Sequence, residues 1–210
     1  MGSKSLIKLF IKDTDINTPK GREIYGRLAG VVGIICNVLL SIMKLIIGSV
    51  SNSVSITADA TNNISDAGSS IVTLVGFRLS GKPADKDHPY GHARIEYISS
   101  LIISFIILLI GCSIFKESVI KIFKPEESLF NIATVIILVV SIIVKLWLSV
   151  FNTYLGKQID SKALEATAID SRNDVITTTA VLIASVISHF TGFNLDGYMG
   201  VIVSIFILIS

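Results

Sequence analysis

The stretch LAGVVGIICNVLLSIMKLIIGSV, residues 28–50, contains a single charged residue, Lys44, and is long enough to cross a bilayer as one helix. Five further, predominantly apolar runs follow it along the chain. The six runs lie at 28–50, 53–79, 97–120, 129–155, 163–190 and 195–210. Hydrophobic residues make up 51% of the chain and charged residues 16%, so too few polar side chains are present to cover a water-soluble domain of 210 residues. The sequence therefore predicts an all-α membrane protein, a bundle of six transmembrane helices.

Positive charges divide the predicted loops into two groups. One side of the predicted bundle has three lysines, Lys116, Lys121 and Lys124. The other side has twelve basic residues: Lys4, Lys8, Lys12, Lys20, Arg22, Arg27, Arg78, Lys82, Lys86, Arg94, Lys157 and Lys162. Because cytoplasmic flanks retain an excess of positive charge, we expect residues 1–27 to form a cytoplasmic N-terminal segment. Residues 28–210 then form a transmembrane domain in the cell membrane, with both termini cytoplasmic. The net charge of +2 is too small and too dispersed to indicate a nucleic-acid partner.

Two pairs of oxygen-bearing side chains lie inside the second and fifth predicted helices. Asn62 and Asp66 are four residues apart, as are Asp170 and Asp174, so each pair occupies one face of its helix. A carboxylate at the centre of a membrane helix costs about 2.5–3.5 kcal/mol on insertion scales, so it needs a compensating partner. Three carboxylates and an amide oxygen, with no thiolate or imidazole, are typical of a hard divalent-cation site. We therefore predict a metal site at these four residues.

The alternative is structural. Lys44, Lys145 and Arg172 also lie inside predicted helices, and they would pair with the carboxylates and hold the bundle together. Asp59 lies seven residues before Asp66 and therefore shares roughly the same stripe of the helix. We expect Asp59 to line a cavity or to support helix packing rather than to bind the same ion.

A second cluster of metal-binding residue types lies in the loop between the second and third predicted helices. Asp85, His88 and His92 stand within eight positions of one another, and imidazole with carboxylate suits zinc and several other transition metals. Such short clusters also arise in ordinary solvated turns. The loop is therefore a possible second metal site, with a solvated turn as the alternative.

These motifs together resemble those of the cation diffusion facilitator family of metal transporters. The resemblance covers nearly the whole chain and rests on the segments Lys44–Gly48, Ser53–Ser55, Ala58–Asp66, PADKDHPYGHARIE at 83–96 and Asp170–Asp174. It implies a six-helix, proton-coupled exporter of divalent transition metals that forms a homodimer, with its transport site on the second and fifth helices.

The identity of the four site residues implies the cargo. Asn at position 62 with Asp at 66, 170 and 174 resembles the bacterial manganese-exporting branch of that family. The loop residues Asp85, His88 and His92 fall on positions that bind a second metal in some zinc-transporting relatives. The family also adds a ferredoxin-like cytoplasmic domain after the sixth helix, and the sequence ends before such a domain, so we expect it to be absent.

Two rival functions remain open, and the residues argue against a third. The first is export of zinc, iron, cobalt or cadmium by the same kind of transporter. The second is a membrane metal sensor that binds the ion without moving it. The third is an intramembrane aspartyl protease, but a dyad needs only two carboxylates that share a proton, so two further ligands would have no role. We therefore expect no enzymatic activity and no cofactor, and a transported metal, Mn²⁺, as the cargo.

Overall fold

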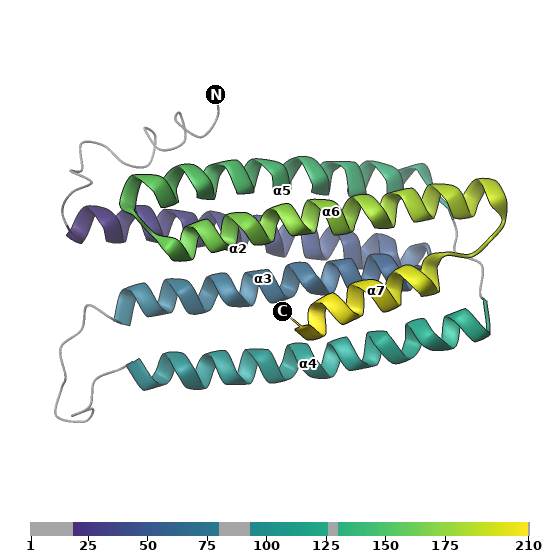
Figure 1. Ribbon diagram of the computed structural model, residues 1–210, viewed down its shortest axis with the longest axis horizontal. Helices are drawn as coiled ribbons and strands as arrows, with labels where there is room; N and C mark the ends of the chain where they lie inside the picture. The colour runs from purple at the N-terminus through teal and green to yellow at the C-terminus, as the bar shows by residue number, and fades with distance from the viewer. Residues whose placement is uncertain (1–18, 80–92, 126–129, 210) are drawn as a thin grey trace.

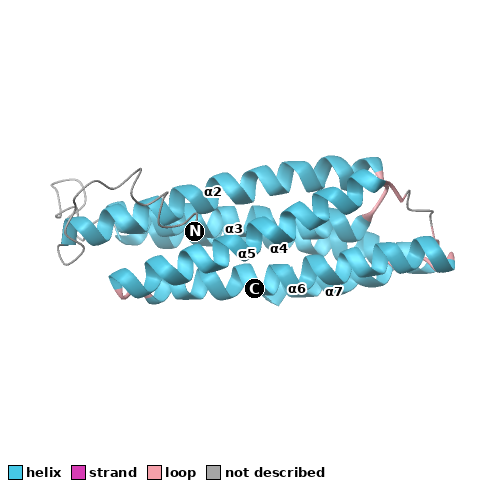
Figure 2. Ribbon diagram, turned by 90° about the horizontal axis from the view of Figure 1, so that it is seen from above, coloured by secondary structure: helices cyan, strands magenta, loops and turns pink. Residues whose placement is uncertain are grey.

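The structure is a computed structural model, and it describes residues 19–79, 93–125 and 130–209. Within these ranges every regular element is a helix (Figure 2). The helices are α2 (Pro19–Val50), α3 (Val54–Leu79), α4 (Ala93–Phe123), α5 (Ile132–Ile159), α6 (Lys162–Thr191) and α7 (Asp196–Ile209). Each predicted apolar run therefore holds one helix.

The largest difference from the predicted boundaries is at the start of α2, which begins at Pro19, nine residues before the apolar run. Proline is favoured at the first helical position because its fixed backbone angle suits a helix and its missing N–H would have no partner there. The apolar pattern marks the part of a helix that suits lipid, whereas the helix itself continues into polar sequence. Part of the predicted N-terminal segment is thus helical.

A tight turn joins α5 to α6 and fixes these two helices as antiparallel neighbours. Asp160 ends α5 in the left-handed conformation, with φ of 48°, and its backbone N–H donates to the carbonyl of Gly156. Ser161 then caps α6, because its side chain accepts a hydrogen bond from the backbone N–H of Leu164. The pair Asp170 and Asp174 is thereby carried on a helix that packs directly against α5.

Helix α3 is the central element of the bundle. It packs against α2, α4 and α7 and touches α6, while α5 lies between α2 and α6, and α4 pairs with α7 (Figure 1). The helix that carries Asn62 and Asp66 is therefore in contact with helices on several of its sides.

The bundle differs from a water-soluble protein both inside and at its surface. Its interior holds charged and polar side chains, among them Lys44, Asp59 and Lys145, each no more than 1% exposed. Large apolar side chains such as Ile46 and Leu101 instead point outward, at 60% and 70% exposure. Soluble monomers rarely expose apolar surface on this scale, and a bilayer is the solvent that this surface suits.

Three of the described helices are long and apolar enough to cross a membrane by length and composition: Ile24–Val50, Ile132–Ile159 and Lys162–Thr191. Helix α3 carries two aspartates and two asparagines in its first half, which lowers its hydropathy. Helix α7 is apolar but has only 14 residues.

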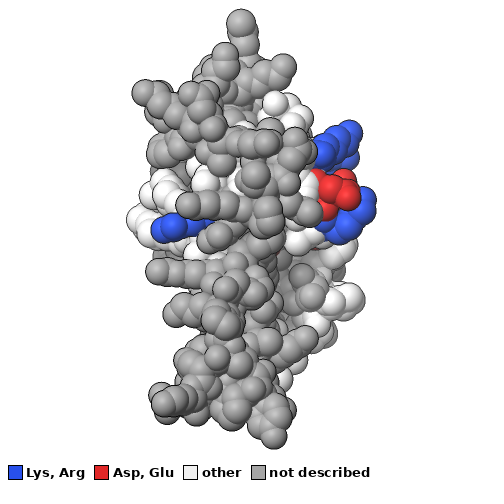
Figure 3. All heavy atoms as spheres, turned by 90° about the vertical axis from the view of Figure 1, so that its left-hand side faces the viewer, with Lys and Arg blue, Asp and Glu red and all other residues white. Residues whose placement is uncertain are grey.

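Among residues 19–79, 93–125 and 130–209, the basic residues of the two groups lie toward opposite ends of the bundle. The start of α2, the end of α3, the start of α4 and the α5–α6 turn share one end (Figure 1). Figure 3 looks onto this end and shows basic side chains with acidic ones between two of them. The end of α4, with Lys116 and Lys121, lies at the other end, and Lys124 directly follows this helix.

Candidate functional site

A cavity of about 140 Å³ lies inside the bundle, between residues of α2, α3, α5, α6 and α7. All four residues of the predicted metal site, Asn62, Asp66, Asp170 and Asp174, line it. The i, i+4 spacing places each pair on one face of its helix, and both faces line this cavity.

Asp174 is the centre of the polar contacts in this cavity. Its Oδ1 accepts a hydrogen bond from the Asn62 amide nitrogen at 2.5 Å, which joins α6 to α3. Its Oδ2 accepts a hydrogen bond from Lys145, and the same Lys145 Nζ lies 2.5 Å from Asp66 Oδ2. Asp170, one helical turn away, is exposed and lines the same cavity. In the described ranges, no three Asp, Glu, His or Cys residues are close enough to hold one metal ion together.

A second ion pair lies beside the cavity and is completely buried. Lys44 Nζ is 2.7 Å from Asp59 Oδ2, and both side chains are 0% exposed. Thr178 completes the cluster: its hydroxyl donates to the Asp59 carboxylate at 3.0 Å and accepts from Lys44 at 3.2 Å. The helix-packing role expected for Asp59 fits this geometry, because the cluster joins α2, α3 and α6.

The structural alternative from the sequence analysis therefore holds in part. Lys44 pairs with Asp59, away from the four predicted ligands. Lys145 pairs with two of those ligands. The Arg172 side chain instead donates from Nε to Ser149 Oγ at 3.0 Å, and this bond joins α6 to α5.

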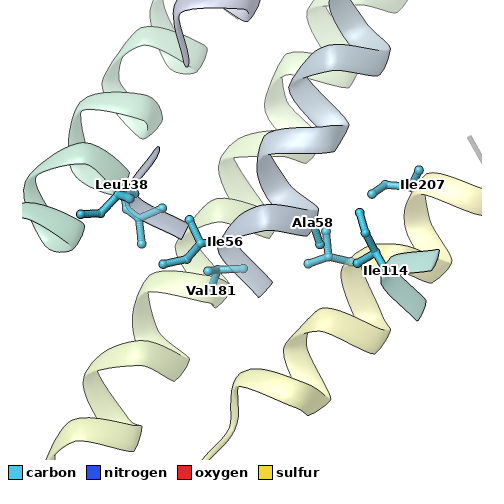
Figure 4. Close-up of a cluster of buried hydrophobic side chains, with 8 residues drawn as sticks. Ile56, Ala58, Ile114, Leu138, Val181 and Ile207 are labelled. Atoms are coloured by element: carbon cyan, nitrogen blue, oxygen red, sulfur yellow. The ribbon is translucent and has the colours of Figure 1, made fainter. Parts of the chain in front are cut away.

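An apolar layer closes the bundle interior on one side of these polar clusters. Ile56, Leu138 and Val181 come from α3, α5 and α6, point toward one another (Figure 4), and are at most 1% exposed. Along α3 the order is Ile56, Asp59, Asn62 and Asp66. The layer therefore lies beyond the buried ion pair as seen from the cavity.

A larger cavity of about 530 Å³, lined by both polar and apolar side chains, lies on the far side of that layer. Its lining includes Ser55, Ser185, Ser188 and His189, from α3 and α6. On its own side of the layer, the smaller cavity extends past Asp66 to Ser70 on α3 and to Thr167 on α6. That direction leads to the end of the bundle that carries most of the basic residues.

Asp196 ties the helix ends together next to the larger cavity. Its carboxylate is 3.0 Å from Lys121 Nζ and accepts hydrogen bonds from the hydroxyls of Ser53 and Ser55, each at 2.5 Å. It also accepts from the backbone N–H of Val54 at 2.8 Å, which caps the start of α3. This cluster joins α3, α4 and α7, and no pattern in the sequence predicted it.

Two cavity residues lie outside the predicted ligand set: Asn37, which no sequence pattern singled out, and Lys145, for which only a structural role was predicted. Asn37 lines the smaller cavity and is 4% exposed, and its Oδ1 has no hydrogen-bond partner among the described residues. It lies seven residues before Lys44. An interval of seven places Asn37 and Lys44 on one stripe of α2. This spacing is the feature of the sequence that could have indicated that Asn37 faces the interior of the bundle.

The possible second metal site cannot be placed, because Asp85, His88 and His92 lie outside the described residues. It stays a prediction.

Comparisons with known proteins agree with one another. The family model "Cation efflux transmembrane domain" matches residues 30–210. The manganese efflux system protein MneS of Bacillus subtilis is 34% identical over 79% of this chain and 57% of its own length. An uncharacterized transporter of Methanocaldococcus jannaschii is 32% identical over 84% of this chain and 62% of its own.

The magnetosome protein MamB of Magnetospirillum gryphiswaldense is also similar, at 31% identity over 75% of this chain and 52% of its own. The chain thus spans between half and two thirds of the length of these relatives. Since the family model covers most of the chain, the chain belongs to the cation efflux, or cation diffusion facilitator, family of membrane metal transporters.

Proposed function

We propose that this protein exports Mn²⁺ from the cytoplasm across the cell membrane in exchange for protons. One observation carries the proposal: three carboxylates and an amide from α3 and α6 line a single cavity inside a bundle whose outer surface is apolar. Intramembrane carboxylates are costly, and where they occur they mark ion pathways.

The donor chemistry favours a hard cation. Oxygen donors suit manganese, whereas sulfur and imidazole ligands favour softer metals. Asn37 adds one more amide oxygen to the cavity wall. The cavity of about 140 Å³ leaves room for a cation that keeps some of its water, since one water takes about 30 Å³. Two relatives are named manganese efflux proteins, which supports the same cargo.

The arrangement of cavities suggests how access alternates. The smaller cavity extends toward the end of the bundle that carries most of the basic residues, which the positive-inside rule assigns to the cytoplasm. The layer of Ile56, Leu138 and Val181 separates it from the larger cavity at the other end. Cargo would enter from the cytoplasm, and the layer would part for release.

Proton exchange follows from the same carboxylates. A metal ligand must be deprotonated, so protons and metal compete for its oxygens. Protons that enter from the outer side would lower the negative charge of the site and release the cation. We propose a homodimer with six transmembrane helices per subunit and with both termini in the cytoplasm.

The test is metal flux into proteoliposomes under an imposed pH gradient, with Mn²⁺, Zn²⁺, Fe²⁺, Co²⁺ and Cd²⁺ compared. We expect Asp66→Ala, Asp170→Ala and Asp174→Ala each to abolish most of the Mn²⁺ flux. Glu117→Ala is the matched control, because Glu117 is an exposed carboxylate on α4 that does not line the cavity.

Three outcomes would contradict parts of this proposal. Undiminished flux in two of the three aspartate variants would refute the site. Metal binding without flux in the wild type would identify a sensor instead. Preferential transport of another metal in the panel would support the proposed transport function but would contradict manganese as the main cargo.

A further inference from the structure

Lys145 has an unusual position for a basic residue in a cation transporter. Its side chain is 1% exposed and extends from α5 into the space between α3 and α6. There its ammonium group contacts Asp66 Oδ2 at 2.5 Å and Asp174 Oδ2. Of the described residues that line this cavity, Lys145 is the only one with a basic side chain.

The ammonium group occupies the oxygens that a metal ion would need. Asp66 and Asp174 come from the two helices that carry the proposed ligands, and one Lys145 Nζ bridges them. A metal ion and an ammonium group repel each other, and both require the electron pairs of the same carboxylate oxygens. Lys145 must therefore move aside before a metal can bind to both aspartates.

We propose that Lys145 is a tethered competitor: its ammonium group holds the cation's position in the empty site and gives it up only to a divalent ion. This inference rests on the proposed function of the site. The lysine stem is a flexible chain of four carbons, so the ammonium group can withdraw when the metal enters and return when the metal leaves. Its return helps to expel the cargo.

Charge explains why the competitor favours divalent cargo. Three ionised aspartates carry −3, and Lys145 reduces the site to −2. A potassium or sodium ion brings no more charge than the ammonium group that it would displace, so it gains nothing by the exchange. A divalent ion brings twice that charge to the same carboxylates. Lys145 thus excludes abundant monovalent cations from the site.

The test measures Mn²⁺ binding to the purified full chain in nanodiscs by titration calorimetry, with and without potassium chloride. We expect Lys145→Met to bind Mn²⁺ at least ten times more tightly than wild type in buffer free of sodium and potassium. Potassium should weaken Mn²⁺ binding by Lys145→Met and leave the wild type almost unchanged. Net flux by Lys145→Met should fall, because the tighter complex releases its cargo slowly.

Two control variants separate a local effect from a change in total charge. Lys145→Arg keeps the positive charge and should retain the wild-type response to potassium. Lys162→Met removes one positive charge from an exposed side chain, 82% exposed, and should change neither affinity nor potassium sensitivity. If Lys145→Met does not fold, Lys145→Gln replaces it with a neutral polar chain of similar length.

The outcomes distinguish the two proposals. Wild-type protein that neither binds nor transports Mn²⁺ refutes the proposed function and this inference together. The second outcome concerns only the tethered competitor. If the wild type binds and transports Mn²⁺, but a folded Lys145→Met or Lys145→Gln binds Mn²⁺ no more tightly than the wild type, the tethered competitor is refuted and the proposed function stands. Lys145 would then be a structural link between α3, α5 and α6.

Discussion

Replacement of Lys44 by methionine tests the buried ion pair next to the proposed transport site. The Lys44 ammonium group and the Asp59 carboxylate are 2.7 Å apart with both side chains fully buried. At an effective dielectric constant of about 20, two unit charges at this distance attract by about 6 kcal/mol, before the cost of removing them from water is counted. Loss of one partner from a buried pair costs about 3–5 kcal/mol, because the other charge is left uncompensated.

Lys44→Met should therefore destabilise the bundle strongly. In a chain of this size, about 1 kcal/mol lowers the melting temperature by roughly 2–4 °C. The expected fall is thus about 6–20 °C, measured by thermal unfolding in detergent micelles. Thr178 still donates a hydrogen bond to Asp59, but one hydroxyl does not replace an ammonium group.

The double variant Lys44→Met, Asp59→Asn provides the control. It removes both charges and keeps an oxygen that accepts from Thr178, so most of the lost stability should return. Because Asp59 is not one of the proposed ligands, the double variant should bind Mn²⁺ as wild type does. If it is no more stable than Lys44→Met, the ion pair is not the source of the effect. If it loses Mn²⁺ binding, Asp59 belongs to the site after all.

Three further predictions concern the donors and the topology. Asn62→His should raise the ratio of Zn²⁺ to Mn²⁺ flux in vesicles under one pH gradient, because an imidazole nitrogen favours zinc; an unchanged ratio would show that position 62 is not a ligand. Asn37→Leu should weaken Mn²⁺ binding about tenfold in calorimetry, a loss typical of a residue that supports the ligands through their hydration or hydrogen bonds, and unaltered affinity would show that the Asn37 amide does not contribute to the site. In a background without the native cysteines, Lys162→Cys should react with an impermeant maleimide only from the cytoplasmic side and Lys124→Cys only from outside. The reverse pattern would invert the orientation.

The sequence predicted the helices and the four cavity residues for related reasons. Both follow from periodicity within a single helix: an apolar run marks a helix, and a spacing of four places Asn62 beside Asp66 and Asp170 beside Asp174. That these two faces meet at one cavity was an inference from the cost of isolated carboxylates, and the bundle brings them together.

Which cation pairs with which carboxylate could not be predicted from the sequence. Lys44 and Lys145 are each the single lysine of an apolar run. Lys44 forms a buried ion pair with Asp59, whereas Lys145 extends into the cavity. The difference depends on how α2 and α5 are rotated about their axes, which only the packing of the whole bundle decides. The position of Asp196 at the start of α3 depends in the same way on where α7 enters the bundle.

The buried apolar layer of Ile56, Leu138 and Val181 would also limit proton leakage through the protein. Protons cross a membrane protein along unbroken files of hydrogen-bonded water, and a closely packed apolar layer holds no such file. A proton in one cavity then has no path to the other unless the helices move. A cell that contains many copies of this protein without cargo would thus keep its proton-motive force. A serine in place of Val181 would add a polar group to the layer and allow a slow proton leak.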